Sequence, residues 1–188
     1  MSLELRGCGT ALVTPFRKDG SLDLDALRRL VQFQLRAGID FLVPCGTTGE
    51  TPTLEHAEFL AVVRTVVQEV AGRVPVIAGV GGNNTRKVID LAAEVRGLGV
   101  QGVLSVAPYY NKPTQEGLYQ HFQAMAESTD LPIIVYNVPA RTSWASTPRR
   151  IQLSSGTRPA AARDSLKAPS TPPAGSPAGK VSSALLRF

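Results

Sequence analysis

Residues 41–50 read FLVPCGTTGE, an apolar run followed directly by a turn that two glycines bound. Similar apolar runs occupy residues 9–13, 74–78, 102–106 and 131–135. They recur about every 30 residues, which is the length of one strand and one crossover helix. Their apolar residues are consecutive rather than alternating, as in parallel strands that are buried on both faces. The pattern therefore predicts a parallel sheet.

Amphipathic helices are predicted between these runs, because apolar residues recur there at intervals of three and four. The helical stripes begin near Leu24, Leu60, Val88 and Leu118, and Thr53 is a candidate N-cap for the second of them. The strict alternation of strand and helix predicts an α/β fold with right-handed crossovers. Periodicity alone fits a barrel and an open, doubly wound sheet equally well.

The composition changes after Thr142. Residues 143–188 contain nine serines, eight alanines and six prolines, and no sixth apolar run appears at the expected spacing. A segment of this composition does not bury enough apolar surface to form a packed core. We therefore predict two parts, an α/β domain at 1–142 and a disordered or irregular basic tail at 143–188.

The net charge of +5 belongs to this tail. Residues 143–188 carry seven Lys or Arg and one Asp, a net charge of +6, which leaves 13 basic and 14 acidic residues, a net of −1, in the remainder. The basic residues of the tail are scattered and have little aromatic interleaving, unlike those of a nucleic-acid-binding surface. The sequence therefore predicts no nucleic-acid partner.

The sequence gives little indication of a membrane span, a disulfide, a metal site or a nucleotide site. No run of 18 apolar residues is present, so no membrane span is expected, and the lack of a secretory signal pattern predicts a cytoplasmic location. Cys8 and Cys45 form no disulfide framework, and we interpret both as small buried thiols. His56 and His121 have no partner at ligand spacing, so no metal site is predicted. The glycine-rich residues 79–82 lack the third glycine and downstream acid of a dinucleotide fingerprint, so no cofactor is predicted.

Polar side chains gather directly after three of the runs. Thr47 and Thr48 follow the second run, in a turn whose hydroxyls and backbone amides suit a small carboxylate. Tyr110 follows the fourth run, and Tyr136 and Arg141 follow the fifth. Taken alone, the turn at residues 46–50 is typical of an ordinary strand–helix connection. Each tyrosine taken alone is typical of an amphipathic residue at the edge of the hydrophobic core. Together, at one edge of a parallel sheet, they predict a shared pocket with an acid–base group and a carboxylate-binding guanidinium.

Three segments in this order, 46–50, 108–113 and 136–142, resemble the dihydrodipicolinate synthase family of pyruvate-dependent class I aldolases. The resemblance covers about residues 7–142 and implies an incomplete (β/α)8 barrel of the TIM type, with about five βα units. It also implies a lyase of diaminopimelate and lysine biosynthesis, which joins pyruvate to aspartate semialdehyde through a lysine Schiff base. Homotetramers are common in the family, and no cofactor is implied.

The resemblance assigns roles to the polar residues. Thr47 and Thr48 would bind the carboxylate of pyruvate, and Arg141 would bind the carboxylate of the aldehyde. Tyr136 would move protons through Thr48 and through a Tyr110 that a partner chain contributes. The candidate catalytic residues are therefore Tyr136, Thr48 and Tyr110, and the candidate substrate-binding residues are Thr47, Thr48 and Arg141.

One part of the family pattern is missing. The Schiff-base lysine is expected on a sixth strand, a little over twenty residues after Arg141, where residues 162–164 read ARD. Lys167 is the nearest amine, but no β pattern flanks it, and a surface lysine is the better interpretation. We therefore predict a chain without catalytic activity of its own. The alternatives are a truncated or frameshifted fragment that acts as an interaction module, and an unrelated open-sheet binding protein.

Overall fold

The computed structural model describes residues 5–142, in which strands and helices alternate. The elements, including the 3-10 helices η1 and η2, are in chain order β1 (Gly9–Ala11), α1 (Leu24–Arg36), β2 (Phe41–Val43), η1 (Thr47–Gly49), η2 (Thr51–Thr53), α2 (His56–Val70), β3 (Ile77–Gly79), α3 (Thr85–Gly97), β4 (Gly102–Val106), α4 (Gln115–Ser128), β5 (Ile133–Tyr136) and α5 (Pro139–Thr142). The predicted α/β alternation is confirmed. The predicted tail at 143–188, which contains Lys167, lies outside the described residues.

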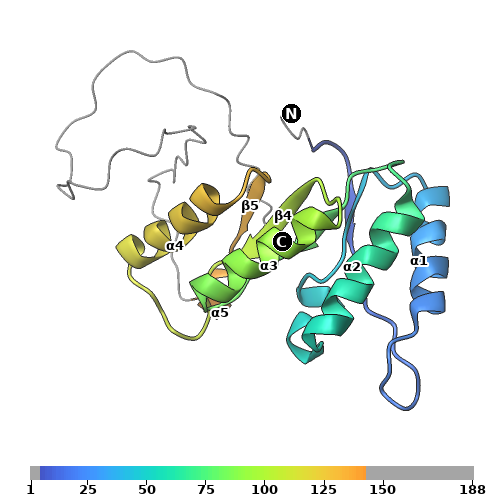
Figure 1. The fold of residues 1–188 in the computed structure, drawn as a ribbon, viewed down its shortest axis with the longest axis horizontal. Coiled ribbons are helices and arrows are strands. Elements are labelled where there is room, and N and C mark those ends of the chain that lie inside the picture. Colours follow the sequence, from blue (N-terminus) through green and yellow to red (C-terminus); the bar gives the residue numbers. More distant parts are fainter. Residues whose placement is uncertain (1–4, 143–188) are drawn as a thin grey trace.

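The strands are parallel, and each one lies beside its neighbour in the sequence. Figure 1 labels the last two of them, β4 and β5. β1 pairs with β2, and β3, β4 and β5 form a second ladder. A parallel bridge between Leu42 and Val76 joins the two ladders, and the Gly79 amide donates to the carbonyl of Pro44 at 2.9 Å. The described residues therefore form one continuous arrangement of five parallel strands.

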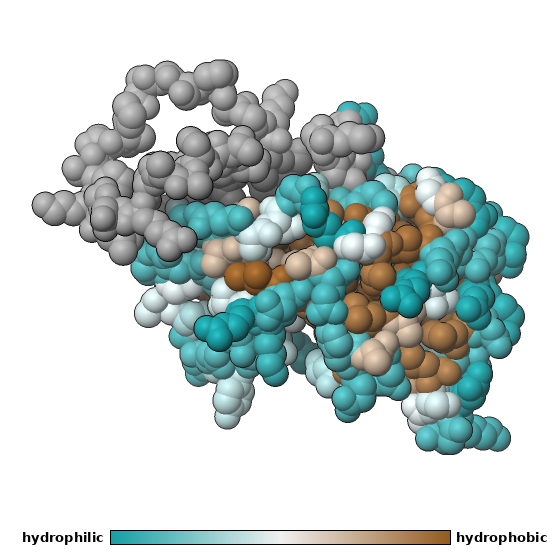
Figure 2. Space-filling view, in the orientation of Figure 1, coloured by the Kyte–Doolittle hydropathy of each residue, from teal (hydrophilic) through white to brown (hydrophobic). Residues whose placement is uncertain are grey.

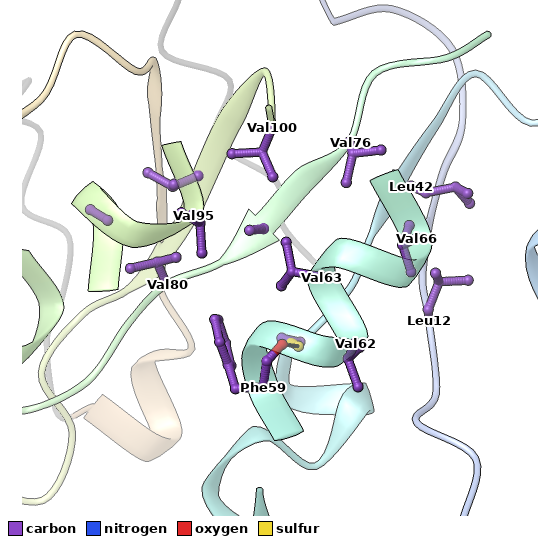
Figure 3. Packing of buried hydrophobic residues seen from close by; sticks show 14 of the residues in the cluster. Leu12, Leu42, Phe59, Val62, Val63, Val66, Val76, Val80, Val95 and Val100 are labelled. Carbon is purple, nitrogen blue, oxygen red and sulfur yellow. Dashed lines mark hydrogen bonds between the residues drawn. The ribbon is translucent and has the colours of Figure 1, made fainter. Parts of the chain in front are cut away.

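The two faces of this sheet have different neighbours. Leu42 lies in a large apolar cluster with residues of the helices (Figure 3). Ala78 and Val103 belong to the same cluster. The opposite face forms a second cluster of strand residues, to which no helical residue of the described range belongs; its members are Phe41, Val43, Ile77 and Ile134, with Leu5 and Leu104 against them. Helices thus cover one face only, as in a barrel, whereas a doubly wound sheet has helices on both faces. The barrel interpretation is confirmed.

Helix α2 contributes much of the large cluster. Phe59, Val63 and Val66 recur at intervals of three and four and are at most 4% exposed (Figure 3). Burial of such a side chain contributes about 1.5–3 kcal/mol, so this face of α2 fixes the helix on the sheet. The outer side is mixed: Figure 2 shows hydrophobic residues among hydrophilic ones over α2, where Leu60 and Val67 are only partly buried.

The start of α2 differs from the prediction. Glu55 is its N-cap and forms a capping box with Glu58, whose carboxylate accepts a hydrogen bond from the Glu55 amide at 3.0 Å. This reciprocal arrangement satisfies two backbone amides at once. The hydroxyl of Thr53 donates instead to the carbonyl of Glu50 at 2.9 Å. The prediction of Thr53 as the N-cap is therefore wrong.

The two cysteines lie in different environments. Cys45 is buried, and burial raises the pKa of its thiol to about 12. Cys8 is exposed just before β1, where its backbone amide donates to the carboxylate of Asp40 at 2.6 Å. The buried-thiol interpretation is thus confirmed for Cys45 and wrong for Cys8, because the backbone rather than the side chain of Cys8 makes the contact. No helix in the described part is long and apolar enough to cross a membrane.

Candidate functional site

The carboxyl ends of the five parallel strands meet at one edge of the sheet, which we call the rim. The loop after β2 carries Thr47 and Thr48, the loop after β4 carries Tyr110, and the end of β5 leads to Tyr136 and Arg141. Ligand sites of barrel enzymes lie at this edge. The structure therefore places every predicted site residue of the described range at the same rim.

The loop of residues 46–50 has an unusual backbone. Cys45 and Glu50, which flank its core, have φ angles of 55° and 52°. Left-handed conformations in residues other than glycine cost about 1–3 kcal/mol each, so the surrounding structure must hold this loop. Thr47 and Thr48 lie between the two reversals, in η1, and both side chains are exposed.

Hydrogen bonds hold this loop by its carbonyl oxygens. The Thr14 hydroxyl, buried at the end of the first unit, donates to the carbonyl of Gly49 at 2.7 Å. The Thr51 hydroxyl lies 2.5 Å from the carbonyl of Cys45. The Gly49 amide closes the turn by donating to the carbonyl of Gly46 at 2.9 Å. The carbonyls of Cys45, Gly46 and Gly49 are therefore bound from within the protein.

The donors of the loop remain available. Within residues 5–142, no acceptor binds the backbone amide or the hydroxyl of Thr47 or Thr48. Unpaired amides and hydroxyls beside one another form a surface that suits an anion. The loop can thus offer a small carboxylate both backbone and side-chain hydrogen bonds.

Tyr110 projects outward from a tight turn. Its φ angle is 68°, and the Asn111 amide donates to the carbonyl of Tyr109 at 2.8 Å. The side-chain amide of Asn111 also reaches the carbonyl of Asn83 at 3.3 Å, which ties this loop to the preceding one. The Tyr110 side chain is 89% exposed, so it contributes little to the interior of its own chain.

Tyr136 is the last residue of β5 and is half-buried. It pairs in register with Val106, and its carbonyl accepts a hydrogen bond from the Ala107 amide at 2.8 Å. Side chains alternate along a strand, so Tyr136 lies on the face of Ile134, which the helices do not cover. This face is the interior of a barrel.

Arg141 is exposed and lies in the short helix α5. Its backbone amide donates to the carbonyl of Val138 at 2.8 Å. The buried hydroxyl of Thr142 lies 2.5 Å from Oδ1 of Asn137, which closes the turn after β5. The backbone that carries the Arg141 guanidinium is therefore part of a hydrogen-bonded turn at the rim.

The separations across the rim follow from the sheet. β2 and β5 are three strand spacings apart, or about 14 Å along a flat sheet. Curvature into a barrel shortens the path through the interior. Thr48 and Tyr136 thus lie at the same rim but follow strands that are not adjacent.

Thr14 and Thr51 are functional candidates that the sequence did not reveal. Both bind carbonyls of the loop that carries Thr47 and Thr48. The available signal was their position, since each threonine follows a strand or its loop directly, as Thr47 and Thr48 do. That signal is weak, because hydroxyl-to-carbonyl bonds have no fixed spacing in sequence.

Amines are scarce in the described range. Lys18, Lys87 and Lys112 are its lysines, and each of them is exposed. None of the three lies on a strand. A buried amine near the inner side of the sheet is therefore absent from residues 5–142.

Five parallel βα units with their helices on one face define the N-terminal part of a TIM-barrel fold. The chain belongs to the dihydrodipicolinate synthetase family, whose sequence model matches residues 4–155. The 4-hydroxy-tetrahydrodipicolinate synthase of Koribacter versatilis is 58% identical over 142 residues, which are 75% of this chain and 47% of that protein. The chain thus spans about half the length of the curated relatives it matches.

Solved structures give the same result. Dihydrodipicolinate synthase from Aquifex aeolicus superposes with a TM-score of 0.72 at 47% identity, covering 74% of this chain and 47% of the other. The synthase from Thermotoga maritima gives a TM-score of 0.71 at 52% identity, covering 73% and 46%. The synthase from Acinetobacter baumannii, at 46% identity, is a complex with pyruvate. The predicted family and the predicted barrel-type fold are confirmed.

Proposed function

We propose that this chain carries the pyruvate-recognition half of a 4-hydroxy-tetrahydrodipicolinate synthase, a cytoplasmic lyase of lysine biosynthesis. The observation that carries the proposal is the loop of residues 46–50: the carbonyls of Gly46 and Gly49 are bound from within the protein, while the donors of Thr47 and Thr48 stay available. Four donors side by side match the two oxygens of a carboxylate. Pyruvate is the small carboxylate that fits this family.

The remaining rim residues take the other roles. Arg141 would bind the carboxylate of aspartate semialdehyde, because its exposed fork of donors stands beyond β5. Tyr136 would transfer protons through Thr48, with Tyr110 of a partner chain completing the relay. The exposure of Tyr110, 89%, supports a role outside its own chain. The working assembly would then contain at least two copies of the chain, and a homotetramer is the family's usual form.

Condensation needs a buried amine on the inner side of the sheet, and residues 5–142 do not supply one. An unprotonated lysine would add to C2 of pyruvate and expel water, and loss of a C3 proton would give the enamine that attacks the aldehyde. The lysines of the described range are exposed and lie off the strands, and Lys167 has no strand pattern around it. We therefore propose recognition of pyruvate without turnover.

Reductive trapping tests the absence of turnover. The full chain is incubated with pyruvate and sodium cyanoborohydride, and its peptides are mapped by mass spectrometry. We expect no pyruvyl adduct on any lysine. An adduct on Lys167 or another lysine at the rim would show that the chain has an amine able to form the iminium with pyruvate. That result would refute this part of the proposal.

Ligand-observed NMR tests recognition separately. Pyruvate should bind the full chain, and the double variant Thr47→Val/Thr48→Val should lose that binding. Thr53→Val is the matched control, because its hydroxyl binds Glu50 beyond the donor surface. Equal pyruvate signals with all three proteins would contradict recognition by this loop.

A further inference from the structure

The peptide between Cys45 and Gly46 is enclosed on one side by β3. A Cβ atom built on Gly79 would lie 2.0 Å from the carbonyl oxygen of Cys45 and 2.7 Å from the amide nitrogen of Gly46. No side chain fits in that space, so only glycine at position 79 lets the two backbones meet. The Gly79 amide meanwhile donates to Pro44, which keeps β3 in register beside this peptide.

The other contact with this peptide comes from Thr51. The hydroxyl of Thr51, which is half-buried at the start of η2, lies 2.5 Å from the carbonyl of Cys45 and 3.1 Å from that of Gly46. A hydroxyl has one proton to donate, and two neighbouring carbonyls share it here. Both carbonyls must therefore turn toward Thr51.

Gly46 itself does not resist rotation of this peptide. Its φ and ψ angles are −78° and −173°, and it has no side chain to restrict neighbouring orientations. Cys45, on the other side, has a φ of 55° that a β-strand residue does not adopt unaided. The peptide is thus held by its neighbours and not by local preference. If it rotated, the turn that aims the amides of Thr47 and Thr48 would start in another direction.

We propose that Thr51 and Gly79 are positioning residues that fix the Cys45–Gly46 peptide and so aim the donors of Thr47 and Thr48 at the carboxylate. Thr51 holds the carbonyl side, and Gly79 supplies the backbone against which the peptide lies. Neither residue contacts the ligand in this scheme. The identity of the ligand as pyruvate rests on the proposed function, whereas the positioning of the Thr47 and Thr48 amides does not.

The test removes the Thr51 hydroxyl from the full chain. Thr51→Val keeps the shape of the side chain and deletes the donor, Thr51→Ala deletes it without a second methyl, and Thr51→Ser retains it. Thr53→Val is the matched control, because that hydroxyl binds the carbonyl of Glu50, outside the Cys45–Gly46 peptide, at 2.9 Å. Amide resonances of Thr47 and Thr48 are recorded by NMR without ligand and during titration with pyruvate, and resonances of α4 report folding.

We expect Thr51→Val and Thr51→Ala to shift the amide resonances of Thr47 and Thr48 and to weaken pyruvate binding roughly tenfold, the effect of one lost hydrogen bond. Thr51→Ser and Thr53→Val should resemble the unmodified chain. Unmoved Thr47 and Thr48 resonances in folded Thr51→Val or Thr51→Ala would overturn the inference, whatever pyruvate does. Shifted resonances in a chain that never binds pyruvate would uphold the positioning role and refute the proposed function.

Discussion

The hydroxyl of Thr14 donates a hydrogen bond of 2.7 Å to the carbonyl of Gly49, a residue 35 positions further along the chain. Thr14 is 5% exposed, so water does not compete for this bond. A Cβ on Gly49 would lie 3.1 Å from the carbonyl of Leu12, which shows how closely the end of the first unit approaches the loop. The donor surface of Thr47 and Thr48 is therefore built by two βα units rather than by one.

Removal of this buried donor should lower stability. Thr14→Val leaves the carbonyl of Gly49 buried without its partner, and such a loss costs about 1–3 kcal/mol in the free energy of unfolding. Thr14→Ser keeps the hydroxyl and should lose less than half as much. Denaturant unfolding followed by circular dichroism measures both values. Equal stability of Thr14→Val and the unmodified chain would contradict this account.

Replacing Gly79 and Gly97 with alanine should change the stability of the chain in opposite directions. Gly79→Ala places Cβ 2.0 Å from a backbone oxygen, and overpacking that forces a backbone shift costs about 1–3 kcal/mol. Gly97→Ala is the matched control, since nothing lies within 4 Å of its Cβ and it ends helix α3. It should stabilise the chain by about 0.5–1 kcal/mol. Thermal unfolding of both variants tests the pair, and a tolerated alanine at position 79 would be inconsistent with the observed fit.

The two thiols should react at very different rates. Burial raises the pKa of Cys45 to about 12 and shields its sulfur, so at neutral pH it stays a protonated, inaccessible thiol. Cys8 is exposed. With a thiol reagent such as iodoacetamide, the native chain should label at Cys8, and Cys45 should label only after denaturation. Cys8→Ser should abolish the native-state reaction, and rapid labelling of Cys45 in that variant would count against the buried position.

Stability should fall in mildly acidic solution because of His121. This side chain is buried, its Nδ1 lies 2.9 Å from the Thr85 hydroxyl, and its Nε2 has no partner within the described residues. Burial lowers the pKa of His121 below the usual histidine value, so the unfolded chain takes up a proton that the folded chain resists. The free energy of unfolding should therefore decrease as pH falls below about 6.5.

A pair of variants isolates this effect. His121→Gln removes the titrating ring and should flatten the slope of unfolding free energy against pH between about 5 and 7. Thr85→Val deletes the hydrogen bond but keeps the ring, so it should lower stability and retain the slope. Denaturant titrations at several pH values supply the comparison. An unchanged slope in His121→Gln would show that other groups set the acid sensitivity.

The order of strands and helices could be predicted from the sequence, and the run at 102–106 coincides with β4. The one-sided cover of the sheet by helices could not be predicted, because periodicity does not tell on which face the helices will lie. The second apolar cluster shows which face the helices leave uncovered, since Phe41, Ile77 and Ile134 meet there without a helical residue of the described range. This information resides in contacts between units and not within any one of them.

The candidate site was predictable to a similar extent. The positions of Thr48 and Tyr136 at the rim follow from the ends of parallel strands. The contributions of Thr14 and Thr51 do not, because a hydroxyl can bind any carbonyl that the fold brings near. Thr53 was misassigned for the same reason: it satisfies a carbonyl, while Glu55 and Glu58 satisfy the first amides of α2.

The pairing of each strand with its sequence neighbour has a kinetic consequence. Each pair of neighbouring strands is separated in the sequence by a single α-helix and its loops. The chain entropy lost when a new strand pairs with the previous one therefore stays small. A growing polypeptide can then add one unit at a time to the edge already formed, in the order of synthesis. Each completed edge serves as the template for the next strand, and assembly does not have to wait for distant segments to meet.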